Sequence, residues 1–181
     1  FNKSDLALAA EFPTVPQDEV GRTLVRLHSV AVKEDHTILV GDVQRKVLTE
    51  HSDGGFLLRT IPVEIAPYYL HVVGNGRLAV SDGAKKVGVV NDNGVTLLTI
   101  RPTIGCQPVS HCTGVCSDGS GLYIAMHNGD GTGHIHHYDA RGAFRGCMSG
   151  SLFKPQGISF AADGHQIAVA DFFSVKMYHV G

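Results

Sequence analysis

The sequence repeats one pattern of short apolar segments four times. In each copy a first, a second and a third apolar segment follow one another, and Gly-rich turns separate them. The residues directly after the second segment are Asp42, Asp82, Met126 and Asp171, which are 40, 44 and 45 residues apart. Repeats of this length with several short strands each are typical of β-propeller blades and β-solenoids. We therefore expect an all-β protein built from successive small sheets.

The turns and a fourth apolar segment in most copies predict blades of four antiparallel strands. Turns such as Asp53-Gly54-Gly55 and Asn93-Gly94 supply the positive φ that tight hairpins need. The predicted blades within this single segment, 1–181, are 28–61, 69–100, 111–148 and an incomplete last blade, 155–181, preceded by an outer strand at residues 5–12.

The predicted outer strand at residues 5–12 precedes the first complete blade, and this leaves two possible arrangements of about four blades. Residues 5–12 could complete the last blade and close a small ring, or the blades could form an open arc of a six-bladed ring. We favour the arc because the units look like those of larger rings. The chain begins at Phe1 without an initiator Met, so we also expect it to be a piece of a longer protein.

The last copy resembles the NHL repeat. Its matching residues are Pro155, Gly157, Ile158, Val169, Asp171, Val175 and Tyr178, and the weaker likeness of the other copies extends over residues 5–181. The resemblance implies a non-catalytic recognition platform. Many such propellers lie at the C-terminal end of tripartite-motif proteins, where a RING domain carries ubiquitin-ligase activity and the propeller recruits the target. No RING, B-box or coiled coil lies in this chain, so we expect it not to be an enzyme.

Composition and charge exclude several classes of protein. The chain has 15 basic and 17 acidic residues and a net charge of −2, which is no general footprint of a polyanion-binding protein. It has no signal peptide and no apolar run long enough to span a membrane. Four cysteines are too few for a disulfide scaffold and indicate reduced thiols in an intracellular, cytoplasmic protein. We expect no membrane, no cofactor and no small-molecule substrate.

Loops that follow the second strand of each blade are the predicted binding surface, because they should share one rim of the propeller. The residues of this surface are Arg45, Lys46, Lys85, Lys86, Asn128, Asp130, Phe172 and Phe173. A protein partner is the first expectation. RNA is the alternative, because the basic pairs could contact phosphates and the two phenylalanines could stack on bases.

Two weak candidates for a metal site lie in the third copy. Oxygen side chains at alternate positions, Asn128, Asp130 and Thr132, resemble the start of a calcium loop. The following strand would carry Asp139 roughly 16 Å away at about 3.3 Å per residue, which argues against a complete loop. His134 and His136 share one face of that strand and could hold zinc, although no thiol or carboxylate can be placed beside them.

A metal-dependent propeller lyase or lactonase is the second alternative. His28 and His111 lie near the starts of innermost strands and could line the central channel, but the matching positions offer no carboxylate. Cys116 is interpreted as a small core residue. The repeated Asp42, Asp82 and Asp171 are interpreted as structural acceptors for backbone N–H groups of the next turn, and not as catalytic carboxylates.

Overall fold

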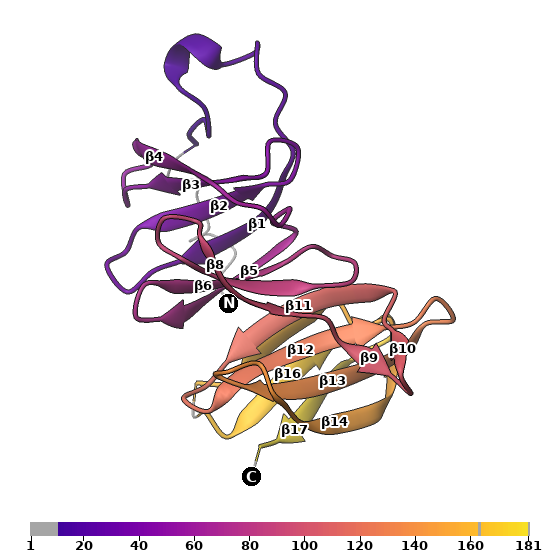
Figure 1. Cartoon of the computed structure of the whole chain (residues 1–181). Helices are drawn as coiled ribbons and strands as arrows, with labels where there is room; N and C mark the ends of the chain where they lie inside the picture. Colours follow the sequence, from indigo (N-terminus) through magenta and orange to yellow (C-terminus); the bar gives the residue numbers. More distant parts are fainter. Residues whose placement is uncertain (1–10, 163, 181) are drawn as a thin grey trace, which may run out of the picture.

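The computed structural model describes residues 11–162 and 164–180, which form strands, turns and one short 3-10 helix, η2 (Gln17–Glu19). The strands make four antiparallel sheets that follow one another along the chain as the blades of a propeller (Figure 1). The predicted all-β propeller is therefore confirmed. No helix among these residues has the length and apolar character needed to cross a membrane.

The first three blades have four strands each, and their spatial order is the chain order. Blade 1 contains β1 (Leu27–Val32), β2 (Ile38–Asp42), β3 (Val47–His51) and β4 (Leu57–Pro62). Blade 2 contains β5 (Tyr69–Gly74), β6 (Arg77–Ser81), β7 (Val87–Asn91) and β8 (Thr96–Ile100). Blade 3 contains β11 (His111–Ser117), β12 (Gly121–His127), β13 (Thr132–Asp139) and β14 (Phe144–Phe153).

Blade 4 has three strands in the described residues: β15 (Gly157–Phe160), β16 (Gln166–Ala170) and β17 (Val175–His179). A small hairpin, β9 (Thr103–Ile104) and β10 (Gln107–Pro108), connects blades 2 and 3. In Figure 1 blade 1 (indigo to purple) lies in the upper half, below the loop that carries η2, and blades 3 and 4 (orange and yellow) lie in the lower half.

The hydrophobic core consists of three layers, each between two successive blades. The layer between blades 1 and 2 includes Leu39, Leu48, Leu78 and Val80. The layer between blades 2 and 3 includes Val87, Val89, Ile124 and Met126, and the layer between blades 3 and 4 includes Tyr123, Ile135, Ile167 and Val169. Burying each such aliphatic side chain contributes about 1.5–3 kcal/mol, so the stacking of blades is the main source of stability.

The position of a strand within the stack decides whether both of its faces are buried or only one. β12 lies between two blades, and all seven of its residues are buried. A strand covered on both faces reads as a continuous apolar run. β17 belongs to the last blade and alternates between exposed and half-buried residues. One face of that strand is therefore uncovered.

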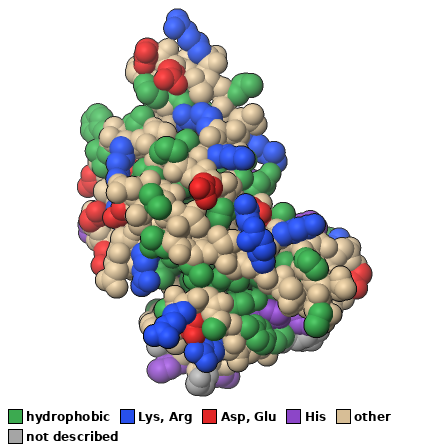
Figure 2. All heavy atoms as spheres, in the orientation of Figure 1, with side chains coloured by type: hydrophobic (Ala, Val, Ile, Leu, Met, Phe, Trp, Pro, Cys, Tyr) green, Lys and Arg blue, Asp and Glu red, His purple; other side chains and the backbone are tan. Residues whose placement is uncertain are grey.

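The outer faces of the first and last blades expose apolar side chains. Val30 and Val32 of blade 1 are 63% and 60% exposed, and Val175 of blade 4 is 68% exposed. Figure 2 shows hydrophobic side chains on the surface of the upper part of the molecule, where blade 1 lies. These side chains are exposed among residues 11–162 and 164–180, and the choice between an open arc and a ring closed by residues 5–12 stays a prediction.

The predicted strand 5–12 falls largely outside the described residues, because only residues 11 and 12 of it are described. The Phe12 ring lies 4.9 Å from the ring of His51, between centroids, and it also covers Gly55. These two contacts place Phe12 against blade 1.

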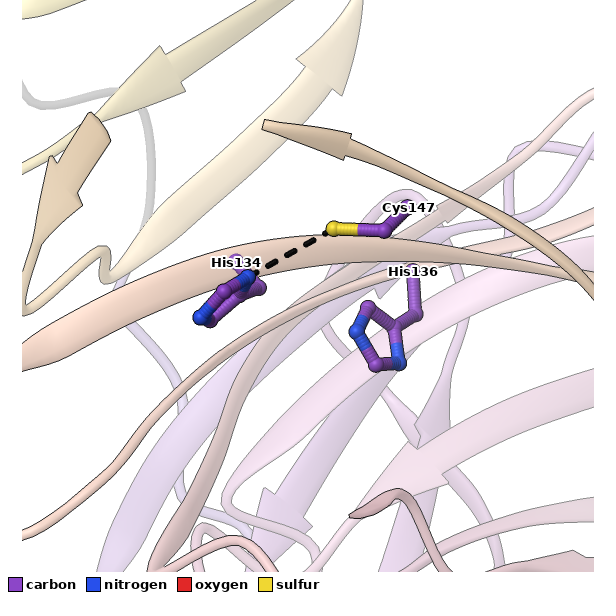
Figure 3. A group of neighbouring side chains, drawn as sticks. All are labelled: His134, His136 and Cys147. Carbon is purple, nitrogen blue, oxygen red and sulfur yellow. Dashed lines mark hydrogen bonds between the residues drawn. The ribbon is translucent and has the colours of Figure 1, made fainter. Parts of the chain in front are cut away.

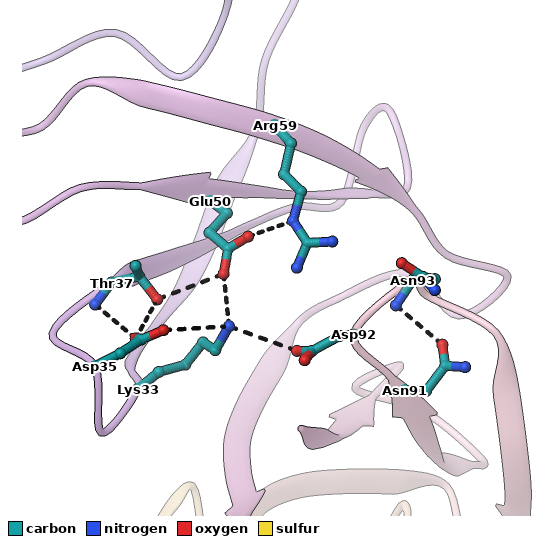
Figure 4. Close-up of polar contacts among 8 residues, drawn as sticks. All are labelled: Lys33, Asp35, Thr37, Glu50, Arg59, Asn91, Asp92 and Asn93. Carbon is teal, nitrogen blue, oxygen red and sulfur yellow. Dashed lines mark hydrogen bonds and ion pairs between the residues drawn. The ribbon is translucent and has the colours of Figure 1, made fainter. Parts of the chain in front are cut away.

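A charged network joins blades 1 and 2 at their outer edge (Figure 4). The buried Glu50 carboxylate accepts hydrogen bonds from Arg59 and from Lys33, whose Nζ lies 2.6 Å from Glu50 Oε1. Lys33 also lies 3.5 Å from Asp92 in the turn between β7 and β8. Burial alone would raise the pKa of Glu50, but the hydrogen bonds and charges of Arg59 and Lys33 outweigh it and lower that pKa.

Glu50→Gln should lower the free energy of unfolding by about 2 kcal/mol at pH 7, because Lys33 and Arg59 lose the buried carboxylate that they share. A lowered native pKa means that the stabilisation is complete above the ordinary value of 4.5 and is lost as the pH falls through the native value. The variant should therefore lose less stability than the wild type between pH 7 and pH values below 4.5. Urea unfolding at both pH values measures this, with the exposed Glu34→Gln as the control. Equal acid sensitivity of Glu50→Gln and wild type would contradict it.

Candidate functional site

The loops after the second strand of each blade lie at one rim of the propeller, because all four sheets have the same strand order and direction. These loops connect β2 to β3, β6 to β7, β12 to β13 and β16 to β17. All eight residues of the predicted binding surface lie in them or directly beside them. The structure thus places the eight residues on the same rim, spread over four blades.

Aspartates order these loops. Asp42 Oδ1 accepts backbone N–H bonds from Gln44 and Arg45, and Asp171 Oδ1 accepts them from Phe173 and Ser174. The interpretation of these repeated aspartates as structural acceptors is confirmed. Their carboxylates fix the backbone of these turns, and other side chains lie at the loop tips.

Three phenylalanines form an exposed cluster on the rim of blades 3 and 4, which we call the aromatic cluster: Phe153, Phe172 and Phe173. Phe153 stacks on Phe173 with ring centroids 5.4 Å apart, and Phe172 contacts both rings edge-on at 6.0 and 5.1 Å. Phe172 and Phe173 remain 66% and 76% exposed. Phe172 and Phe173 adjoin each other, so the exposed aromatic area is contiguous, unlike that of a single exposed phenylalanine such as Phe56.

Lys154 and the backbone of neighbouring loops hold the aromatic cluster in place. Lys154 Nζ lies 5.5 Å from the ring centroid of Phe153 and 5.9 Å from that of Phe172, which is within cation–π range. Lys154 N–H donates to Gly131 O, and Phe172 N–H donates to Phe153 O. These bonds connect the β12–β13 loop, the segment after β14 and the β16–β17 loop.

Sequence reasoning missed Phe153 and Lys154. Both residues directly precede Pro155, where the best NHL-like copy starts, and this position was the sequence signal that could have identified them. Their proximity to Phe172 depends on how blade 4 stacks on blade 3, and no local pattern reports that.

The basic residues of the rim differ in how exposed their side chains are and in whether those side chains already form ion pairs. Arg45 is tied to Asp42 by a 2.6 Å ion pair and donates to Thr14 O, and its side chain is only 20% exposed. Lys46 and Lys85 are exposed, and Lys86 is half-buried. Figure 2 shows Lys and Arg dispersed over the drawn face among acidic side chains. Arg45 therefore stabilises the β2–β3 loop. Lys46, Lys85 and Lys86 are the predicted basic residues that a partner could contact.

The predicted calcium-loop residues form an ordinary hairpin turn. Asn128 N–H donates to Thr132 O, and Thr132 N–H donates to Asp130 Oδ1. Asp139 lies at the far end of β13 and accepts bonds from Arg141, Ala143 and Arg145. The geometric objection to a full calcium loop is confirmed, because strand β13 separates Asp139 from the turn.

His134 and His136 do share one face of β13, and Cys147 of β14 lies beside them (Figure 3). Across residues 11–162 and 164–180, these three residues are the group whose geometry could hold a metal ion. The two histidines were predicted from the sequence, and the thiol was not.

The histidines near the axis have other contacts. His28 Nδ1 lies 2.9 Å from Tyr68 O, and the ring of His111 stacks on that of His127 with centroids 4.4 Å apart.

Burial raises the pKa of both Cys112 and Cys116 to about 12, which keeps these thiols protonated. Cys116 lies in the layer between blades 3 and 4, so its interpretation as a core residue is confirmed.

No protein-family model and no curated protein sequence matches the chain. Solved structures do resemble it. The computationally designed Ika4 protein has a TM-score of 0.62 at 15% identity, with 89% of this chain and 95% of that chain covered. The designed Ika8 protein has a TM-score of 0.61 at 14% identity, covering 87% of this chain and 46% of the other.

A natural protein is also similar in structure. Myxococcus xanthus glutaminyl cyclase has a TM-score of 0.59 at 16% identity, with 87% of this chain and 75% of that chain covered. At such low identity these likenesses show the fold alone. The chain is a propeller built from four antiparallel sheets, and its relation to NHL repeats stays a prediction.

Proposed function

We propose that the chain is a non-catalytic recognition module that binds a protein partner through the aromatic cluster and Lys154. The resemblance of its copies to NHL repeats leads us further to propose that it recruits the substrate of a cytoplasmic tripartite-motif ubiquitin ligase. The ligase activity would then reside in a RING domain outside these residues.

One observation carries the proposal: two phenylalanines at a loop tip are mostly exposed and packed against a third. A fully buried aromatic side chain removes about 150–250 Å² from water, and aromatic residues dominate the energetics of protein interfaces. The hydrogen bonds from Phe172 to Phe153 and from Lys154 to Gly131 pre-order the backbone, which lowers the entropic cost of binding. Lys154 adds a positive charge beside the rings. A partner with an apolar side chain next to a carboxylate would complement this surface.

Phe172→Ser combined with Phe173→Ser should abolish detectable partner capture, with a loss of binding of more than about 30-fold, because hot-spot residues are worth 2 kcal/mol or more. The measurement is cross-linking and mass spectrometry of cell extract on immobilised wild-type and variant protein. Phe56→Ser is the matched control, since Phe56 is 77% exposed but lies in blade 1. Partners retained equally by the double variant would overturn the proposal.

RNA is the second candidate, and the position of Lys154 over two phenyl rings is the observation that favours it. Exposed rings beside a cation can stack on single-stranded bases while the cation meets a phosphate. A labelled RNA pool titrated at low and high salt separates the two candidates. Affinity that falls steeply with salt and is lost in Lys154→Ala would favour RNA; absence of affinity at low salt would remove it.

A further inference from the structure

Blade 3 brings three metal-ligating side chains together on its two outer strands. His134 and His136 come from β13 and Cys147 from β14 (Figure 3). The ligand atoms of the three residues all lie within 4.8 Å of one another, and His134 Nδ1 lies 3.5 Å from Cys147 Sγ. This group is separate from the aromatic cluster, so it does not depend on the proposed function.

The spacing suits a tetrahedral ion. With Zn–S near 2.3 Å and Zn–N near 2.0–2.1 Å, ligand atoms around zinc lie about 3.3–3.8 Å apart. The distance between His134 Nδ1 and Cys147 Sγ already falls in that range. The remaining separations are at most about 1.5 Å too long. Side-chain rotation of the half-buried His134 and the exposed Cys147 can supply a movement of that size.

An irregularity in the sheet creates the group. Ile135 pairs with Ser149, but His136 pairs with Cys147, so Met148 is an extra residue in β14. Without that bulge, Met148 would stand opposite His136 and the thiol would move one position away. Bulges are frequent where a strand re-aims a side chain at a functional site.

The surroundings of His136 favour the ligating form of its ring. Its Nδ1 lies 3.3 Å from the hydroxyl of Tyr138, and the Phe144 ring packs on it with centroids 4.9 Å apart. When Nδ1–H donates to that hydroxyl, the lone pair of Nε2 is left for a metal. Ligating histidines usually have such an outer partner.

We propose that His134, His136 and Cys147 bind one zinc ion, with the fourth coordination position open to water. Imidazole and thiolate are the donors that select zinc over calcium or magnesium. Three protein ligands and one open position distinguish this site from a closed structural zinc site. Because Cys147 is exposed, the open position can be reached from solvent.

The test is a metal titration of the whole chain, freed of any polyhistidine tag. Wild-type protein should retain or take up one equivalent of zinc by elemental analysis. Cobalt(II) as a spectroscopic probe should give intense tetrahedral d–d bands and a thiolate-to-cobalt charge-transfer band. Cys147→Ser should lower zinc affinity by more than about 100-fold and remove the charge-transfer band, because a direct ligand is lost. Cys106→Ser, which changes another exposed cysteine, should change neither.

Tyr138→Phe tests the outer partner. It keeps all three ligands, so the cobalt spectrum should persist while zinc affinity falls about 10-fold. Circular dichroism of each variant shows that the sheet is intact. A wild-type protein that binds no zinc above background, or a Cys147→Ser variant that binds as tightly as Cys106→Ser, would overturn the proposal.

Discussion

Gly114→Ala is expected to lower the free energy of unfolding by about 3 kcal/mol, because the new methyl group would clash with the backbone of the next blade. A Cβ at Gly114 would lie 2.9 Å from Gln156 O and 2.9 Å from Ile158 N, both belonging to blade 4 or its leading segment. Backbone atoms cannot rotate away as a flexible side chain can. Blades 3 and 4 would have to separate, which would also strain the bond from Thr113 Oγ1 to Pro155 O.

Urea unfolding followed by circular dichroism measures this effect, and Gly157→Ala is the matched control. Gly157 also lies in an innermost strand, but the nearest atom to its Cβ would be Ala170 Cβ at 3.8 Å, an ordinary contact. We expect the control to change the free energy of unfolding by no more than about 0.5–1 kcal/mol. Equal effects of the two substitutions would mean that the blades are not packed backbone to backbone at Gly114.

Asp42→Ala should cost about 3 kcal/mol at pH 7, because it removes the buried acceptor of the β2–β3 loop. The fully buried Asp42 accepts backbone N–H bonds from Arg26, Gln44 and Arg45, and it forms the ion pair with the Arg45 side chain. Burial alone would raise the pKa of Asp42, but the hydrogen bonds from Arg45 and Arg26 outweigh it and lower that pKa.

Asp82→Ala provides the graded comparison for Asp42→Ala. Asp82 occupies the same place in blade 2, where it is half-buried and accepts backbone bonds from Ala84 and Lys86. A loss of about 1 kcal/mol is expected for it. Thermal and urea unfolding of both variants measure the difference. A cost for Asp42→Ala no larger than that for Asp82→Ala would show that Arg45 is not held by the buried carboxylate.

The blades and their turns could be predicted because their signals are local. A strand needs a run of mostly apolar residues such as Leu78–Ser81, and a turn needs Gly or Asn with positive φ. An aspartate that orders a loop needs backbone N–H groups two or three residues further along the chain. Gly94 shows the predicted positive φ, and Asp171 accepts from the next loop. Each requirement is met within a few residues, so the linear order of the chain suffices to recognise it.

The sites could be predicted only in part, because their residues meet across strands and blades. His134 and His136 share a face by simple alternation, which the sequence reveals. Cys147 joins them only through a bulge at Met148, and a one-residue change of register alters which side chain faces a neighbour.

The aromatic cluster, too, could be predicted from the sequence only in part. Phe172 and Phe173 were identifiable as loop residues from the repeat, but Phe153 meets them only because blade 4 stacks on blade 3. Repeat length, strand pattern and turn chemistry follow from short-range sterics and hydrogen bonding, and the linear sequence records them. Phe153 meets Phe172 between two blades, and Cys147 meets His136 through the register of two strands, so both contacts exist only once the sheets have assembled.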